Sequence, residues 1–277
     1  MINKVININV DYKKMGVEPS PGQPTLTTYV LDENYLNATE EKKRPAVVIC
    51  PGGAYSFVSA REAEPIALAF CAAGYHAFVL DYSVAPSGWP ASICELSKAM
   101  AYVKEHAEEY NILKNKIFVC GFSAGGHLAA SLAVHHSRPE VLEFAGIKKG
   151  DNIPRGAILS YPVITADERY AHKGSIDNLS CGRAEVRELA SLENYVTEQT
   201  PPAFIWHTFT DASVPVQNSL MFASALVEKK VPVELHVYQY GQHGLSLGSE
   251  VTGSVRPPVQ NWVEMAVRWI KEIDLEQ

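Results

Sequence analysis

The 277-residue chain has no apolar run approaching the roughly 20 residues that a membrane-spanning helix needs. Its opening segment, MINKVININVDYKKMG, alternates apolar and polar residues and lacks the continuous apolar stretch of a signal peptide. Basic runs are short, the longest being Lys42-Lys43-Arg44, and the net charge is −7. These absences argue against membrane insertion, export and nucleic-acid binding, so we expect a cytoplasmic protein.

Cysteine is scarce and odd in number. The five cysteines are irregularly spaced, and several lie inside apolar runs: Cys50, Cys71, Cys94, Cys120 and Cys181. This pattern predicts buried free thiols in a reducing compartment, and not a disulfide framework or a zinc site. None of them lies in a turn that would expose a nucleophile. The cysteine pattern therefore predicts no metal site.

The chain contains no internal repeat, low-complexity tract or flexible linker, which predicts one domain over residues 1–277. Short β-branched runs alternate with amphipathic helical segments, predicting an α/β fold whose mostly parallel sheet is covered on both faces. The expected parallel strands are 46–50, 76–82, 116–122, 156–163, 203–209 and 233–240. Strands at 5–10 and 25–31 would form one antiparallel edge.

Residues 164–200 interrupt the alternation. They are polar and loop-like, with one short helix expected around residues 184–191. We predict a lid-like insertion that lies over the carboxyl ends of the strands.

A serine in a glycine-rich turn is the strongest chemical signal. Gly121-Phe122-Ser123-Ala124-Gly125 is a G-x-S-x-G sequence that follows a β-branched strand and opens a helix. This is the setting of the nucleophile elbow of α/β hydrolases, where the residues two positions either side of the serine must lack bulk. Ser123 is therefore the candidate nucleophile, and the fold prediction becomes the α/β-hydrolase fold.

Ser123 needs a base, and histidine suits the role because its ordinary pKa of about 6.5 lies near working pH. In this fold the acid and then the histidine follow the serine along the chain. His243 lies in a glycine-flanked loop after the last strand, and Asp211 follows the strand before it, so both emerge at the same edge of the sheet as Ser123. Asp211 could instead cap the turn before Val214-Pro215.

Other histidines and aspartates after Ser123 compete less well. His127 would pack beneath the serine, His135 and His136 would lie on the surface, and His207 and His236 fall within strands. The insertion holds three further candidates that the sequence alone does not place: His172, Asp167 and Asp177.

An acyl-transfer enzyme also needs N–H donors for the developing oxyanion. Pro51-Gly52-Gly53-Ala54 follows the strand 46–50 at the place of the lipase HGGG loop, which predicts donors at Gly53 and Ala54 alongside Ala124. Tyr55 and Tyr82 are candidates for lining a substrate pocket, although a core or rim position is the competing interpretation.

Seven motifs follow one another in order between about Pro45 and Leu247: PGGAYSFVS, LDYSVAP, GFSAGGHLAA, YPVI, AHKGSIDNLS, HTFTDASVPVQNS and GQHGLSL. Together they resemble a branch of α/β-hydrolase carboxylesterases that includes bacterial acetyl esterases, xylan-type deacetylases and feruloyl-esterase-like proteins, related to the hormone-sensitive-lipase group. The resemblance implies the same triad and oxyanion amides. Pro51 departs from the lipase pattern, and the missing long N-terminal helical cap suggests an open pocket for bulky alcohols such as sugars.

The leading hypothesis is hydrolysis of small acyl esters, in particular acetyl groups on sugars or oligosaccharides, through an acyl-serine and without a metal or an organic cofactor. One alternative is an arylformamidase or another amide hydrolase that uses the same triad. A non-catalytic ligand-binding protein is the third. Acyl length, the alcohol and a possible homo-oligomer stay open.

Overall fold

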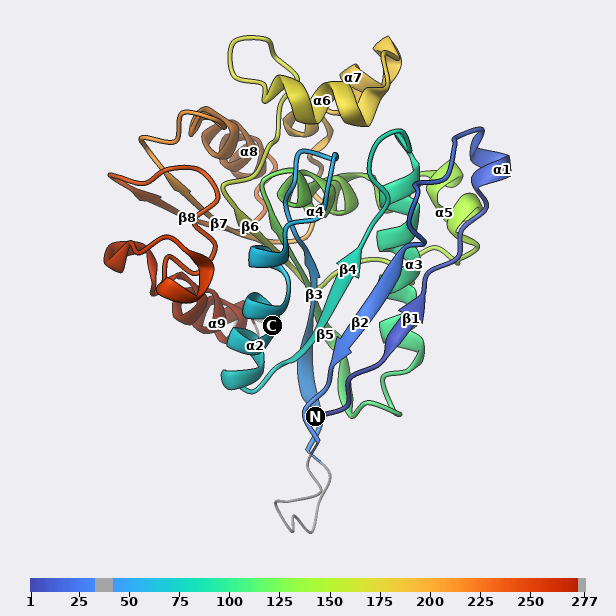
Figure 1. Ribbon diagram of the computed structural model, residues 1–277, viewed down its shortest axis with the longest axis horizontal. Helices are drawn as coiled ribbons and strands as arrows, with labels where there is room; N and C mark the ends of the chain where they lie inside the picture. Colours follow the sequence, from blue (N-terminus) through green and yellow to red (C-terminus); the bar gives the residue numbers. More distant parts are fainter. Residues whose placement is uncertain (33–41, 274–277) are drawn as a thin grey trace.

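The computed structural model describes residues 1–32 and 42–273. Its strands form one eight-stranded sheet in the order β1-β2-β4-β3-β5-β6-β7-β8 (Figure 1). The strands are β1 (Val5–Asn7), β2 (Thr25–Tyr29), β3 (Arg44–Cys50), β4 (His76–Asp81), β5 (Ile112–Phe122), β6 (Ala157–Ser160), β7 (Ala203–Thr208) and β8 (Val233–Tyr238). β1 and β2 pair antiparallel at one edge, and the pairs from β4 through β8 are parallel, which confirms the predicted sheet.

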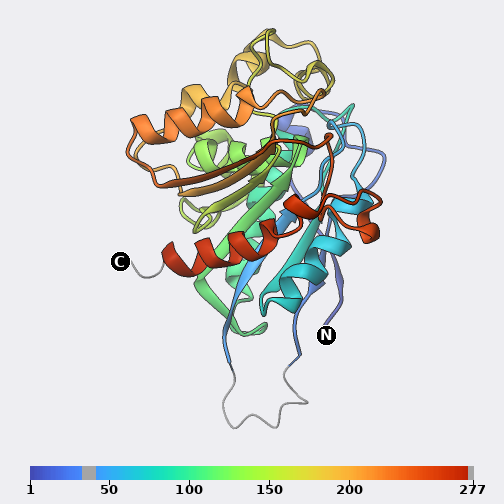
Figure 2. The ribbon, with the colours of Figure 1, turned by 90° about the vertical axis from the view of Figure 1, so that its left-hand side faces the viewer.

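Helices cover both faces of the sheet. One face carries α3 (Ala91–Glu105), α4 (Ala124–His135), α5 (Pro139–Ala145) and α8 (Gln217–Glu228). The other face carries α2 (Glu64–Ala72) and the amphipathic α9 (Trp262–Ile273), drawn cyan and red in Figure 2. Apart from two helices in the segment 164–200, the other helical turns are α1 (Tyr12–Met15), η1 (Ala60–Glu62), η2 (Leu192–Tyr195), η3 (Glu250–Thr252) and η4 (Pro257–Val259).

The central strand β3 shows why this sequence makes a doubly covered sheet. Residues 46–50 are all fully buried. Successive side chains of a strand point to opposite faces, so Ala46, Val48 and Cys50 pack in one apolar cluster while Val47 and Ile49 pack in the other. A strand buried on both faces therefore appears in the sequence as an unbroken apolar run.

The segment predicted as an insertion lies above the carboxyl ends of the strands, at the top of Figure 1. It contains two helices, α6 (Lys173–Ser180) and α7 (Ala184–Leu189), where the sequence predicted one. α6 escaped prediction because it is short and polar, with Ile176 and Leu179 as its only buried apolar side chains.

The prediction that His135 and His136 lie on the surface is wrong. Their side chains are only 2% and 6% exposed. The His135 ring packs against Trp89 and Tyr195, and its Nε2 contacts the carbonyl of Leu189 at 3.2 Å. The end of α4 is thus covered by the insertion, a long-range contact that helical periodicity does not reveal.

All five cysteines are free thiols; four are buried and Cys181, beside the end of α6, is exposed. Burial raises the pKa of the Cys50 and Cys120 thiols, so both stay protonated and inert as nucleophiles. Within residues 1–32 and 42–273, no helix is long and apolar enough to cross a membrane.

Candidate active site

Ser123 occupies a strained turn between β5 and α4. Its φ of 53° and ψ of −118° fall outside the regions that a non-glycine residue favours. Gly121 and Gly125 permit this turn, because a Cβ on Gly121 would lie 2.1 Å from the carbonyl oxygen of Gly125, and one on Gly125 would lie 2.1 Å from that of Cys50. The turn holds the serine hydroxyl at the carboxyl end of β5, in the geometry expected of the nucleophile elbow.

His243 and Asp211 meet Ser123 at this edge of the sheet. Asp211 lies in the loop after β7, and His243 lies in the loop after β8. His243 Nδ1 is 2.7 Å from Asp211 Oδ2, and His243 Nε2 is 2.8 Å from Ser123 Oγ. An ionised carboxylate only accepts hydrogen bonds, so Nδ1 carries the proton and Nε2 is left to accept the serine O–H. The three side chains therefore form one continuous line of contact from Asp211 through His243 to Ser123.

Asp211 is held in its ionised form. Burial alone would raise its pKa, but hydrogen bonds from His207 and His243, the charge of His243 and the amide of Val214 together lower the pKa well below its ordinary value. Its other oxygen, Oδ1, accepts the backbone N–H groups of Ser213 and Val214, each at 2.9 Å. These bonds also fix the carboxylate in the orientation that His243 meets.

His207 is a supporting residue that sequence reasoning left inside its strand. Its buried Nε2 lies 2.9 Å from the Val214 carbonyl and 3.4 Å from Asp211 Oδ2, and its Nδ1 lies 2.8 Å from Ser219 Oγ. The shorter contact makes the Val214 carbonyl its main hydrogen-bond partner. His207 therefore supports the turn that carries Asp211.

Gly53, Ala54 and Ala124 present free backbone N–H groups near Ser123. Within the described residues, the amides of Gly53 and Ala54 donate to no protein acceptor. Ala124 is the first residue of α4, where an N–H has no partner within the helix and the helix dipole favours negative charge. Ala54 adopts a left-handed φ of 55°, and Asn178 of α6 fixes its carbonyl with a 2.8 Å hydrogen bond.

A buried glutamate connects this loop to the loop that carries His243. Glu62 is 3% exposed and accepts the Gly52 N–H at 2.8 Å through Oε2 and the Tyr161 hydroxyl at 2.6 Å through Oε1. The Tyr161 oxygen in turn accepts the backbone N–H of Ser246 at 2.9 Å. The Tyr161 ring stands edge-on to His243, with centroids 5.1 Å apart. We call Glu62, Tyr161 and Ser246 the bridging network; the sequence held no spacing signal for it.

A cavity of about 200 Å³ opens beside Ser123. Its lining includes Ser123 and His243 together with Phe57, Arg61 and His172. Phe57 is 59% exposed at its rim. Sequence reasoning left His172 unplaced because the insertion could not be positioned, and it did not single out Phe57 or Arg61.

Tyr55 and Tyr82 do not line this cavity. Both are 2% exposed; Tyr55 belongs to the loop 51–58, and Tyr82 contacts that loop at Pro51. The Tyr55 hydroxyl is 2.9 Å from His127 Nδ1, and the Tyr82 hydroxyl donates to the Pro51 carbonyl at 2.7 Å. These bonds make the two tyrosines supports of the loop, which matches the competing interpretation of a core position.

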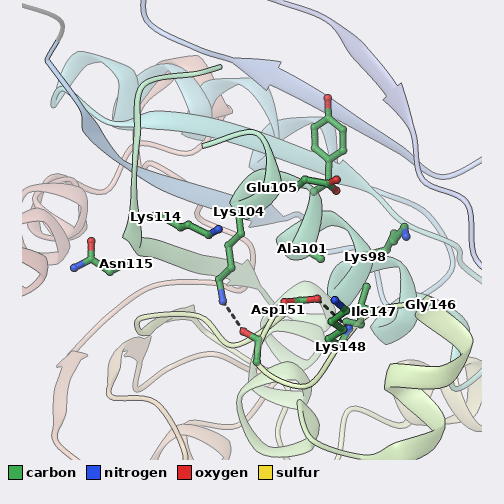
Figure 3. Close-up of a pocket in the computed structure, with 12 residues that line it drawn as sticks. Lys98, Ala101, Lys104, Glu105, Lys114, Asn115, Gly146, Ile147, Lys148 and Asp151 are labelled. Atoms are coloured by element: carbon green, nitrogen blue, oxygen red, sulfur yellow. Dashed lines mark hydrogen bonds between the residues drawn. The ribbon is translucent and has the colours of Figure 1, made fainter. Parts of the chain in front are cut away.

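A larger cavity, of about 830 Å³, lies at the opposite end of β5 (Figure 3). Its lining comes from α3, the start of β5 and the loop before β6, and includes Lys98, Lys104, Lys114 and Asp151. Lys104 is occupied by two backbone carbonyls, those of Gly150 and Ile153. The lining brings no serine, cysteine or histidine together, so size does not identify the catalytic cavity in this fold.

Several known proteins are similar to this chain in sequence. A family model described as BD-FAE matches residues 33–226, a span that holds Ser123 and Asp211. Endo-1,4-beta-xylanase B of Butyrivibrio fibrisolvens is 36% identical over 268 residues, which cover 87% of this chain and 41% of that protein. An acetylxylan esterase of Xylanibacter ruminicola is 30% identical over 212 residues, covering 74% of this chain and 42% of that protein. The chain thus spans about two fifths of the length of these curated relatives.

Among solved structures, an acetyl ester-xyloside bifunctional hydrolase from Caldicellulosiruptor lactoaceticus superimposes with a TM-score of 0.83 and 33% identity, covering 98% of this chain and 96% of that one. A carboxylesterase from Lactobacillus plantarum superimposes with a TM-score of 0.83 and 28% identity, covering 99% of this chain and 98% of that one. The fold is therefore that of the α/β hydrolases, and the chain belongs to the BD-FAE family.

Proposed function

We propose that this chain is a serine carboxylesterase that hydrolyses acetyl esters of sugars, with Ser123 as nucleophile, His243 as base and Asp211 as the acid. The observation that carries the proposal is the continuous contact from Asp211 through His243 to Ser123, at 2.7 and 2.8 Å, beside backbone amides that donate to no acceptor in the described part of the chain. The ester hydrolases among the relatives support this chemistry and do not favour an arylformamidase.

The proposed reaction has two halves. Ser123 Oγ attacks the ester carbonyl carbon as its proton passes to His243 Nε2, and the amides of Gly53, Ala54 and Ala124 receive the developing oxyanion. The C–O bond to the alcohol breaks, and His243 gives its proton to the leaving oxygen. Water then attacks the acyl-serine as His243 takes its proton, which releases acetate and restores the Ser123 hydroxyl.

The substrate class follows from the cavity and the relatives. A volume of about 200 Å³ favours a small acyl group. One relative is named an acetylxylan esterase and one structural neighbour an acetyl ester-xyloside hydrolase, which supports a sugar as the alcohol. We propose further that residues 1–277 act as one domain, and that free cysteines suit a cytoplasmic location.

The test is Ser123→Ala with p-nitrophenyl acetate and an acetylated xylo-oligosaccharide as substrates. We expect kcat/KM to fall more than about a thousandfold on both, with the melting temperature close to that of the wild type. A phosphonate probe should label the wild type at Ser123 and leave the variant unlabelled. Turnover that survives the substitution would remove Ser123 from the mechanism. No labelling of the wild type would instead favour a ligand-binding protein.

A series of acyl-chain lengths, with N-formylkynurenine included, tests the substrate class. Acetate esters should give the highest kcat/KM because longer chains exceed the small cavity. Faster turnover of the formamide than of any ester would replace the proposal with an amide hydrolase.

A further inference from the structure

His172 is the one side chain of the insertion that lines the cavity beside Ser123. It caps the N-terminus of α6, where its Nδ1 accepts the backbone N–H of Ser175 at 3.3 Å and lies 2.8 Å from the hydroxyl of the same residue. The insertion thus delivers an imidazole to the catalytic cavity and holds it there by one ring nitrogen.

The cap determines which ring nitrogen carries the proton. Nδ1 must offer a lone pair to the Ser175 N–H, so a neutral His172 carries its proton on Nε2. Burial, followed by the electrostatic interaction with His243, lowers the pKa of His172, which favours the neutral ring. Nε2–H makes no hydrogen bond with any described residue and remains an unused donor in a cavity wall.

The position of His172 relative to the triad identifies the part of the substrate that it meets. Its side chain lines the same cavity as Ser123 and His243. In the proposed reaction His243 protonates the departing oxygen, so the leaving alcohol must lie beside His243. A donor on that side of the cavity faces the alcohol portion of the substrate.

We propose that His172 is a specificity-determining residue whose Nε2–H donates a hydrogen bond to an oxygen of the leaving alcohol, so that the enzyme selects polyhydroxylated alcohols such as sugars over apolar ones. This inference rests on the proposed function. An alcohol without a second oxygen leaves the donor unpaired when the substrate displaces water, and a site built around a hydrogen bond discriminates against such analogues.

The experiment compares two acetate esters with similar rings, an acetylated methyl xyloside and cyclohexyl acetate, which lacks the additional oxygens. His172→Asn retains a side-chain acceptor that can cap α6 but removes Nε2–H, and His172→Ala removes both. We expect both variants to lose about tenfold in kcat/KM on the xyloside and less than twofold on cyclohexyl acetate.

A matched control separates recognition from loosening of the insertion. Asp177→Asn breaks the 2.5 Å ion pair between Asp177 and Arg187, which joins α6 to α7. Neither residue lines the cavity. This control should leave the ratio of the two kcat/KM values unchanged. Equal losses on both esters in His172→Asn, or no loss on either, would overturn the inference. Such a result leaves the proposed function intact, because that is decided by Ser123→Ala.

Discussion

Tyr161 connects three parts of the site through one hydroxyl and one ring. Tyr161→Phe retains the ring beside His243 but leaves Glu62 Oε1 and the Ser246 N–H without a partner. We expect kcat to fall about tenfold with KM little changed. The substitution should displace the loop that holds the oxyanion amides and the loop that holds His243, and both act on the chemical step. Stability should fall by about 1–3 kcal/mol, the effect of an unsatisfied buried polar group.

Steady-state kinetics and urea unfolding test this expectation. Tyr110→Phe is the control, because its buried hydroxyl pairs with that of Tyr102 at 3.1 Å and has no link to the site. The control should lose stability without losing kcat. If Tyr161→Phe behaved in the same way, the bridging network would be structural alone.

Residues differ in how far their roles can be derived from the sequence. Ser123, Asp211 and His243 could be selected because each follows a predicted strand, and parallel strands end at one edge. Glu62 and Tyr161 could not, since a single glutamate or tyrosine carries no motif and their roles depend on contacts 99 residues apart. His172 required the position of the insertion, which lies outside the strand–helix alternation.

At the scale of elements, α6 is part of the active site as well as a cover over it. Asn178, on this helix, holds the Ala54 carbonyl at 2.8 Å and so fixes a peptide of the strained oxyanion loop. We expect Asn178→Ala to reduce kcat about three- to tenfold, because misaligned amides stabilise the oxyanion less well. Thermal stability should change by less than about 1 kcal/mol, since the lost bond is only partly buried.

The measurement is kcat on p-nitrophenyl acetate together with the affinity of a boronic-acid inhibitor, which mimics the tetrahedral intermediate. In Asn178→Ala, kcat and the affinity for the inhibitor should fall by the same factor. Arg187→Ala, which loosens α6 from α7 without touching the oxyanion loop, serves as the comparison and should change neither. Weaker inhibitor binding in both variants would assign the effect to the insertion as a whole.

The elements that could be predicted are those whose burial is visible in a short window. β3 and the core of β5 are apolar on both faces, and α9 has a clear apolar stripe. α6 is polar apart from Ile176 and Leu179, and distant contacts anchor it, such as the Leu179 carbonyl that accepts the Trp89 N–H at 2.9 Å. A short stretch of sequence does not reveal such long-range contacts, so α6 could not be predicted from it.

At the scale of the whole molecule, the insertion closes over α4 and removes its histidines from water. Burial lowers the pKa of His127 and of His135 to about 4, although hydrogen bonds to the Ala190 and Leu189 carbonyls oppose the shift. In the unfolded chain both imidazoles titrate near 6.5. Folding stability is therefore linked to pH through residues that take no part in the reaction.

The sign of this linkage follows from proton uptake. Between pH 6.5 and 4 the unfolded chain binds protons at both imidazoles and the folded protein does not, so stability rises with pH across this window. The contribution of the two buried, neutral imidazoles to the free energy of unfolding is fully present above pH 6.5. It decreases by about 3 kcal/mol per imidazole by pH 4. Glu95, whose pKa burial raises, contributes with the opposite sign, so the wild-type curve alone does not isolate the histidines.

His135→Phe isolates one of them. The substitution retains an aromatic ring between Trp89 and Tyr195 but cannot be protonated. Urea unfolding at pH 7 and pH 4.5 should show a loss of stability on acidification that is about 2–3 kcal/mol smaller than in the wild type. The Leu189 carbonyl loses its donor at both pH values, so that cost cancels in the difference. If the stability of variant and wild type fell equally on acidification, His135 would be protonated to the same extent in the folded and the unfolded chain. The insertion would then not keep water from α4.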